Sequence, residues 1–402
     1  MYIINILNSF LFFVSFNFYF VDSNSNSLKT YSINSEKLIE LHNSYLNKKL
    51  EENEAFQLLI NKADDLLTMK PVSVIDKSPI PPSEDKHDYM SMGPYWWPNP
   101  DTENGLPYIR KDGERNPEIN QITDHANERK MTDAVYTLSL AYYITGESKY
   151  SSKASQLLRI WYINDSTKMN PNLNYAQGIP GICTGRGIGI IELSSIYKII
   201  DAIKILETSN SWTEMDDEKI YTWFDEYLNW LTTSQYGIDE LNWENNHGSW
   251  YDVQTASVSL FLGKDDLARK IIERAKTKRI DLHIESDGKQ PLELERTKSW
   301  SYSVFNLNAL FLLAYLGEHV GVDLWNYENP KGGSLAKALD YILPFTLNMD
   351  EWKYEQIQKI DIDSIIPLIQ LAEKKINKNL YSDWKKKLFD GKEKKQIFNL
   401  LY

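Results

Sequence analysis

Apolar residues recur at helical intervals along most of this chain. Between residues 131 and 142 they fall at steps of four, three and four, at Met131, Val135, Leu138 and Tyr142, which places them on one face of an α-helix. Similar stripes occupy residues 36–68, 150–162, 188–206, 220–230, 253–262, 265–276, 303–316, 334–345 and 361–376. No convincing run alternates with the period of two that marks a half-buried strand. The pattern predicts an all-α protein.

Turn signals divide these helices into hairpin-like pairs. Glycine-containing turns occur at residues 145–148, 263–265 and 329–333. Three polar and aromatic stretches, 84–124, 163–187 and 236–250, are longer than the usual connectors of a compact domain. A plain helical bundle would fit the periodicity equally well. The order of long and short loops favours an α/α toroid, an incomplete barrel of about six or seven helical hairpins with the long loops at one end.

The N-terminal segment resembles a secretory leader. Residues 3–21 form an apolar run, and Val21, Asp22 and Ser23 form an acceptable cleavage site. No Lys or Arg precedes the run, and Asn5 and Asn8 within it weaken the alternative of a membrane anchor. We therefore expect a signal peptide at 1–23 and a single domain over 24–402. The mature protein is expected to be secreted, with an extracellular or endolysosomal location, and not to bind membranes.

Composition narrows the range of partners. A net charge of −12 argues against nucleic-acid binding, which requires a concentrated positive field. The single cysteine, Cys183, excludes an intrachain disulfide. The histidines are scattered without metal-ligand spacing, so we expect neither a metal nor a cofactor. Aromatic residues make up 13% of the chain, which suits sugar binding, although large aromatic side chains also fill ordinary cores. We expect a monomer.

The densest group of candidate chemical residues lies at 243–254. Asn245, Asn246 and His247 are consecutive there, and Gln254 is a further candidate contact to substrate. A carboxamide can donate hydrogen bonds to a carboxylate, and a neighbouring imidazole can accept a proton near neutral pH. This combination is typical of polyuronate lyases, which neutralise a carboxylate, remove the proton on C5 and protonate the leaving O4. A helix-capping or core histidine is the alternative reading of His247.

A second group follows about fifty residues later, at 293–302. Arg296 can complete the neutralisation of a substrate carboxylate with its planar fork. Tyr302, where a helix is expected to begin, can act as base, acid or both. Which of Tyr302 and His247 removes the proton depends on which lies on the same face of the sugar as the leaving group, and the sequence leaves both assignments open. Taken alone, Arg296 in an ion pair and Tyr302 in the core would be ordinary.

Two polar-aromatic loops supply candidate substrate-binding residues. The first holds Tyr95, Trp96 and Trp97 among prolines and glycines, which stiffen the loop and preclude a helix. Rigid aromatic side chains stack on sugar rings, although the same cluster could plug one end of the toroid. The second loop offers neutral and cationic donors for hydroxyls and carboxylates, namely Asn174, Tyr175, Gln177 and Arg186.

A cleft that binds a polyuronate must be locally basic, because the chain as a whole is acidic. Cations in or near the loops that could supply this charge are Arg110, Lys111, Arg115, Arg129, Lys130, Arg186, Arg296 and Lys298. About half of them would be ordinary solvated surface charges.

The blocks at 90–117, 169–191, 243–254 and 288–310 resemble, in order, those of the alginate lyase domain family, and they cover most of residues 85–345. The resemblance implies an α/α toroid and metal-independent β-elimination on a uronate polymer. It also implies that Asn246 neutralises the carboxylate, His247 and Tyr302 transfer protons, and Arg296 gives electrostatic support. The spacing from Arg296 to Tyr302 is one residue narrower than in the better-known bacterial members. The chain thus resembles a divergent branch that includes fungal-type enzymes acting on glucuronan-like polymers.

Two other classes of function remain open. A glycoside hydrolase of similar toroidal fold needs two opposed carboxylates, which Asp124, Asp133, Glu244 and Asp252 could supply. A non-catalytic carbohydrate-binding extracellular protein would bind sugars without turnover. Product analysis separates these classes, because only a lyase forms an unsaturated, ultraviolet-absorbing sugar end without consuming water.

Overall fold

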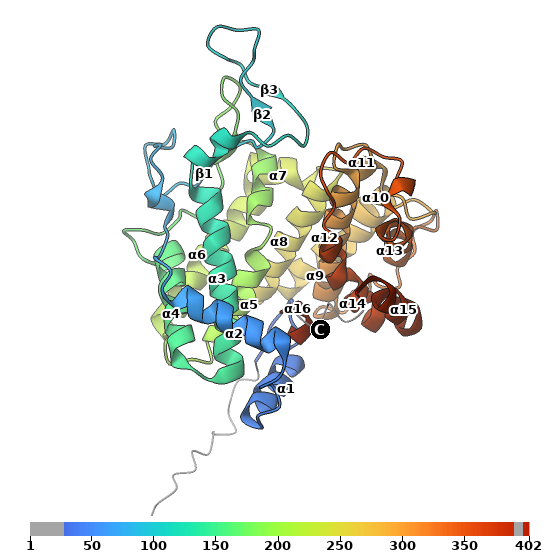
Figure 1. The fold of residues 1–402 in the computed structure, drawn as a ribbon. Helices are drawn as coiled ribbons and strands as arrows, with labels where there is room; N and C mark the ends of the chain where they lie inside the picture. The colour runs from blue at the N-terminus through green and yellow to red at the C-terminus, as the bar shows by residue number, and fades with distance from the viewer. Residues whose placement is uncertain (1–27, 390–396, 402) are drawn as a thin grey trace, which may run out of the picture.

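The computed structural model describes residues 28–389 and 397–401 (Figure 1). The expected signal peptide at 1–23 lies outside these residues. The helices are α1 (Ser35–Leu46), α2 (Glu54–Leu67), α3 (Asp124–Thr145), α4 (Ser148–Leu158), α5 (Ile196–Leu206), α6 (Glu214–Thr233), α7 (Gln235–Leu241), α8 (Asn246–Phe261), α9 (Asp265–Ala275), α10 (Asp281–His283), α11 (Pro291–Leu294), α12 (Ser299–Glu318), α13 (Leu335–Ile342), α14 (Ile366–Lys375), α15 (Lys378–Phe389) and α16 (Phe398–Leu401). The strands are β1 (Met90–Met92), β2 (Trp96–Trp97), β3 (Ile109–Arg110) and β4 (Tyr175–Gly178).

Helix α3 illustrates how the apolar stripe becomes a packed helix. Met131, Val135 and Leu138 are all buried, so the predicted face is the one that packs. The helix ends at Gly146, whose left-handed backbone (φ 75°) closes the last turn by a hydrogen bond from its N–H to the carbonyl of Tyr142. Glycine adopts this conformation without the steric cost that a Cβ would bring. The turn signal predicted from the sequence is therefore a helix cap.

The helices form two layers. Helices α3, α5, α8, α12 and α14 pack against one another in this order, and α4, α6, α9 and α13 pack against members of that series. Helices α8 and α12 are buried along nearly their whole length, as expected for helices that are enclosed on all sides. Helix α9, in contrast, buries one face only. This inner and outer arrangement is the predicted α/α toroid.

The long loops lie together at one end of the toroid, at the top of Figure 1. Strand β1 pairs in parallel with β4, and β2 pairs antiparallel with β3. These strands have two to four residues each, which is too short to produce an alternating sequence pattern. The pairing joins the predicted loops 84–124 and 163–187 to each other, so both are anchored rather than independent.

The expectation of one long loop over 236–250 is wrong. Helix α7 occupies its first part and α8 begins at Asn246, because polar side chains cap both helices. Ser234 accepts a hydrogen bond from the N–H of Gly237, and Asn245 accepts one from the N–H of His247. The buried guanidinium of Arg279 donates to the carbonyls of Leu241 and Trp243 and thereby fixes the short turn that remains.

The core is continuous across the helices. Buried apolar side chains from α1 to α14 belong to one cluster. Over the part of the chain that the structure describes, no helix is both long and apolar enough to cross a membrane. Within the same residues, no group of three or more His, Cys, Asp or Glu side chains is arranged to hold a metal ion.

Candidate active site

A cavity of about 920 Å³ opens at the loop end of the toroid. It collects side chains from the inner helices α3, α8 and α12 and from the loops that carry β1, β2 and β4. Predicted site residues that line it are Tyr95, Trp96, Gln177, Arg186, Asn245, Asn246, His247, Arg296 and Tyr302. Five arginines line it, at positions 110, 115, 129, 186 and 296, whereas Glu192 is its one carboxylate among the described residues. The cavity is therefore basic although the protein is acidic.

Asn246 is the first residue of α8, and a buried carboxylate holds it there. Its main-chain N–H donates to Glu293 Oε1 and its side-chain Nδ2 donates to Glu293 Oε2, each at 2.7 Å. Both residues are 1% exposed. Burial raises the pKa of Glu293 to about 7, although the two hydrogen bonds from Asn246 oppose that rise. The carboxamide is thus fixed at the cavity wall by a group that titrates near neutral pH.

His247, the next residue, has a carboxylate partner of its own. Its Nδ1 lies 2.8 Å from Oε1 of Glu240, a fully buried residue of α7. When the neutral imidazole donates Nδ1–H to Glu240, the lone pair of the ring lies on Nε2. Glu240 lies seven residues before His247, and no motif marked it in the sequence. The pair has the geometry of an oriented general base.

Tyr302 lies in the first turn of α12, and its hydroxyl contacts a second tyrosine. Tyr95 Oη is 2.7 Å from Tyr302 Oη, and Lys298 Nζ donates to Tyr95 Oη at 2.9 Å. Burial and the neighbouring Tyr95 raise the pKa of Tyr302 well above its usual range, although Arg296 opposes the shift. At neutral pH Tyr302 therefore keeps its proton and can donate it.

Arg296 lies against the ring of Tyr302, with its guanidinium carbon 4.0 Å from the ring centroid. Its fork is engaged by Asp112: Nε donates to Oδ2 at 3.1 Å and Nη2 donates to Oδ1 at 2.8 Å. Although burial raises the pKa of Asp112, the hydrogen bonds and charge of Arg296 lower it well below its usual value. Thr297 Oγ1 also donates to the main-chain carbonyl of Asp112. This contact fastens the loop 84–124 to the start of α12.

Trp96 and Arg186 form one wall of the cavity. The Arg186 guanidinium lies 5.8 Å from the centroid of the Trp96 ring and donates to the main-chain and side-chain oxygens of Gln177. Gln177 has a left-handed backbone (φ 50°), which is uncommon for a residue with a side chain and is seen most often where surrounding contacts enforce it. Burial lowers the pKa of Arg186 to about 10, which still leaves it charged at neutral pH.

Four predicted substrate-binding residues lie outside the cavity lining. Trp97 donates from its ring to the carbonyl of Glu114 at 3.0 Å. Asn174 accepts from the Trp230 ring at 3.0 Å, and Tyr175 pairs with Met90 in the β1–β4 ladder. Gln254 is fully buried: its Oε1 accepts from Tyr227 and its Nε2 donates to the carbonyl of Ile190. The side chains of Trp97, Asn174 and Gln254 therefore bind neighbouring parts of the protein.

The cavity also contains a network that the sequence did not indicate. His125 on α3 lies 3.1 Å from Glu192, whose other oxygen accepts hydrogen bonds from Tyr89 and Ser91. Although burial lowers the pKa of His125, the charge and hydrogen bond of Glu192 outweigh this and raise it. Ser91 in turn accepts from the N–H of Gln177 at 2.7 Å. The network connects α3 to the β1–β4 ladder.

The carboxylates considered for a hydrolase are not gathered at the cavity. Asp252 is fully buried and paired with Arg279 and Arg274, and Asp124 is fully buried and paired with Lys77 at 3.0 Å. Glu244 is exposed, and Asp133 pairs with Lys198. None of the four lines the cavity. The arrangement of two opposed carboxylates that hydrolysis requires is not formed by these residues.

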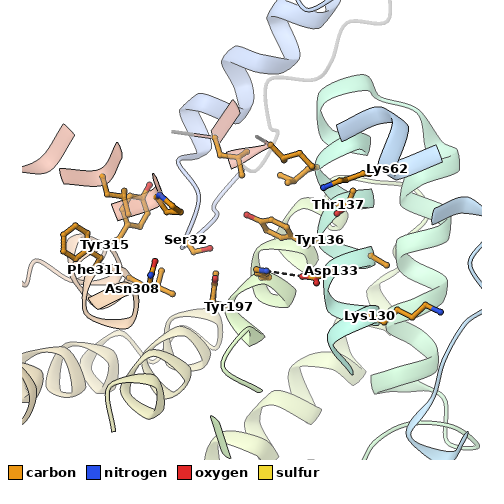
Figure 2. A pocket seen from close by; sticks show the side chains of 18 of the residues that line it. Ser32, Lys62, Lys130, Asp133, Tyr136, Thr137, Tyr197, Asn308, Phe311 and Tyr315 are labelled. Atoms are coloured by element: carbon orange, nitrogen blue, oxygen red, sulfur yellow. Dashed lines mark hydrogen bonds and ion pairs between the residues drawn. The ribbon is translucent and has the colours of Figure 1, made fainter. Parts of the chain in front are cut away.

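A second cavity, of about 890 Å³ (Figure 2), shares part of its lining with the first. Figure 2 draws Tyr136, Tyr197 and Tyr315 among its lining side chains, which come from α3, α5 and α12. Trp250 and Phe305 line both cavities, and their ring centroids are 4.9 Å apart. Along α12, Tyr302 faces the first cavity, Phe305 lines both, and Asn308 faces the second. The two rings thus form the floor of the candidate active site.

An α/α toroid with a carboxamide, an oriented imidazole and a phenol around a basic cavity defines a polysaccharide lyase. The sequence profile of the family described as alginate lyase matches residues 73–352. An alginate lyase from Bacteroides ovatus is 37% identical, with 93% of this chain and 99% of that chain covered, at a TM-score of 0.88. The chain belongs to the alginate lyase family.

More distant solved structures share the fold. Alginate lyase A1-III complexed with a tetrasaccharide is 14% identical over 84% of each chain, with a TM-score of 0.54. The same enzyme from Sphingomonas species A1 gives 15% identity over 79% of this chain and 86% of that chain, with a TM-score of 0.50. A comparison with curated protein sequences gave no match.

Proposed function

We propose that this polysaccharide lyase cleaves alginate, or a closely related polyuronate, by β-elimination without a metal ion. The observation that carries the proposal is the convergence of Asn246, His247 and Tyr302 on one basic cavity. The relatives named as alginate lyases, one of them complexed with a tetrasaccharide, support the choice of substrate. The set of side chains that line the cavity favours elimination over hydrolysis, because amide, imidazole, phenol and guanidinium groups are present with a single carboxylate, Glu192, among the described residues.

The reaction requires three events at one uronate unit. The C5–H bond breaks and its proton passes to a base; the electron pair forms the C4=C5 double bond; and the C4–O4 bond breaks as O4 receives a proton. We assign His247 as the base, because its Nδ1 lies 2.8 Å from Glu240 and a neutral imidazole that donates Nδ1–H there has its lone pair on Nε2. We assign Tyr302 as the acid, because burial raises the pKa of its phenol and so favours the protonated form.

The substrate carboxylate must be neutralised for C5 to become acidic. Asn246 meets it through the carboxamide at the cavity wall, and the surrounding arginines supply positive potential. Arg296 acts chiefly on Tyr302, since its fork is already occupied by Asp112 and its plane covers the phenol ring. A positive charge there stabilises the phenolate that remains after O4 is protonated.

The test is an assay of the purified protein with alginate, glucuronan and glycosaminoglycans. Ultraviolet absorbance from the new C4=C5 bond, with no water consumed, is the expected result on alginate. Activity that survives exhaustive chelation supports metal independence. Reducing ends that appear without ultraviolet absorbance would indicate hydrolysis and would contradict the proposal. We also propose that the protein is exported and monomeric, which N-terminal sequencing of the native protein and light scattering will test.

A further inference from the structure

Glu293 occupies an unusual position for a carboxylate. It is 1% exposed, and its two oxygens accept hydrogen bonds from the main chain and the side chain of one residue, Asn246. In the described part of the chain no cation lies within ion-pair distance of it; Arg296, three residues later, pairs with Asp112 instead. A buried carboxylate without a cationic partner is costly in its ionised form.

The charged groups around Glu293 are few. Arg296 and the protonated form of His247 are the two whose charges favour its ionised form. Each of them has a carboxylate partner of its own, Asp112 for Arg296 and Glu240 for His247, which reduces their influence. Burial therefore prevails and raises the pKa of Glu293 to about 7. A negatively charged ligand placed beside Asn246 would raise this pKa further, because like charges disfavour ionisation.

The hydrogen-bond pattern gives Glu293 two states with different consequences for Asn246. In the ionised state, Oε2 accepts one N–H of the Asn246 carboxamide, as observed. In the protonated state, the same oxygen carries a proton and can donate it to Asn246 Oδ1 once the carboxamide turns over, while Oε1 still accepts the main-chain N–H. The turn releases the one N–H of Nδ2 that Glu293 held, so both N–H groups of Nδ2 become available to a substrate carboxylate.

We propose that Glu293 takes up one proton from solvent when a uronate carboxylate binds at Asn246, and that the protonated carboxyl orients the Asn246 carboxamide to neutralise that carboxylate. Glu293 is a positioning residue in this scheme, because it acts through Asn246. The inference rests on the proposed function, since it requires a uronate ligand in this cavity. Glu293 gains one proton at this step. The hydrogen bond from Asn246 Nδ2 to Glu293 Oε2 is replaced by one from Glu293 Oε2 to Asn246 Oδ1, and no bond in the substrate changes.

Proton uptake on binding can be measured apart from catalysis. The Tyr302→Phe variant, which is expected to bind without turnover, is titrated with an alginate tetrasaccharide at about pH 8 in two buffers of different ionisation heat. The difference in binding heat gives the number of protons taken up. We expect an uptake approaching roughly one proton per site, because Glu293 begins mostly ionised one pH unit above its pKa of about 7.

The Glu293→Gln substitution in the Tyr302→Phe background identifies the proton acceptor. Gln has the shape of the protonated carboxyl: its N–H donates to Asn246 Oδ1 and its oxygen accepts the main-chain N–H. We expect binding at least as tight as in the parent, with the uptake abolished. Binding without uptake in the parent, or uptake that persists with Gln at this position, would overturn the inference while leaving the lyase proposal intact. Absence of binding in the parent would count against the proposed function and the inference together.

A second measurement needs no Glu293 variant and so does not depend on its folding. Difference infrared spectra of the Tyr302→Phe protein, labelled with ¹³C in its glutamate carboxyl groups, should show a new protonated-carboxyl band when the tetrasaccharide binds. A spectrum without that band overturns the inference.

In the active enzyme, Glu293→Gln should retain kcat within about threefold and show less decline of kcat/KM above pH 7 than the parent. Glu293→Ala, which can hold neither orientation, should lose roughly 10²-fold in kcat.

Discussion

The hydroxyl of Tyr95 lies 2.7 Å from the hydroxyl of Tyr302, so two tyrosines 207 residues apart share one hydrogen bond in the lining of the cavity. Tyr95 was expected to be a platform for sugar rings, but its polar end is directed at the candidate acid. Lys298 donates to the same Tyr95 oxygen. The loop 84–124 therefore contributes to the chemistry of α12 as well as to the cavity wall.

Replacing Tyr302 by Phe should lower kcat by roughly 10²- to 10⁴-fold, because the proton donor to O4 is lost. The fold should be retained, since removal of one hydroxyl opens no cavity. Tyr95→Phe is the matched variant: it removes the partner but not the acid, and we expect a loss of about tenfold or less. Initial rates on alginate, with circular dichroism as a control for folding, provide the comparison. Full activity in Tyr302→Phe would refute the assigned mechanism.

Glu240 should matter only through His247. In Glu240→Gln the carboxamide can still hold the imidazole, but the charge that favours the imidazolium after proton transfer is gone. We expect kcat to fall by roughly 10- to 100-fold with little change in KM. His247→Ala should lower kcat by a larger factor than Glu240→Gln. If His247→Ala retains part of its activity on any substrate, Tyr302 acts as both base and acid for that substrate, and Glu240→Gln should then be nearly neutral there.

The helices and the toroid could be predicted because apolar residues recur at helical spacing along the chain and the long loops alternate with short ones. The residues at 245–247 and at 296–302 could be predicted because they are close in sequence and stand where helices begin. The roles of Glu293 and Asp112 could not be predicted, because their partners are distant in sequence. Glu293 binds Asn246, 47 residues away, and Asp112 binds Arg296, 184 residues away. Periodicity carries no information about such pairings. Gln254 shows the converse error: it follows the motif in sequence but points to Tyr227 in the core.

The aromatic loop allows a test of substrate stacking with a built-in control. Trp96 lines the cavity beside Arg186, whereas the Trp97 ring donates to the carbonyl of Glu114 outside the lining. Trp96→Ala should therefore raise KM several-fold more than it lowers kcat, because stacking is lost equally from the ground state and the transition state. Trp97→Ala should leave KM nearly unchanged and lower the melting temperature. If the two variants change KM equally, stacking by Trp96 is not a separate contribution.

The pH dependence of stability offers a prediction away from the proposed chemistry. Glu128 on α3 is 1% exposed and accepts a hydrogen bond from Thr132 at 2.8 Å. Burial raises its pKa from 4.5 to about 7. The folded protein thus holds this proton to a higher pH than the unfolded chain does, so its contribution to stability is greatest below about pH 4.5 and is lost as the pH rises to about 7.

Glu128→Gln should remove that loss. The raised pKa corresponds to at most about 3 kcal/mol in the free energy of unfolding. Between about pH 5 and pH 8, the stability of the variant relative to the parent should therefore increase by up to that amount. Urea denaturation at both pH values measures the difference, and Glu226→Gln, at an exposed position of α6, is the control. If the free energy of unfolding varies with pH in the same way for the parent and for Glu128→Gln, Glu128 is ionised in the folded protein well below neutral pH. In that case the positive charges of His125 and Arg129 stabilise its carboxylate.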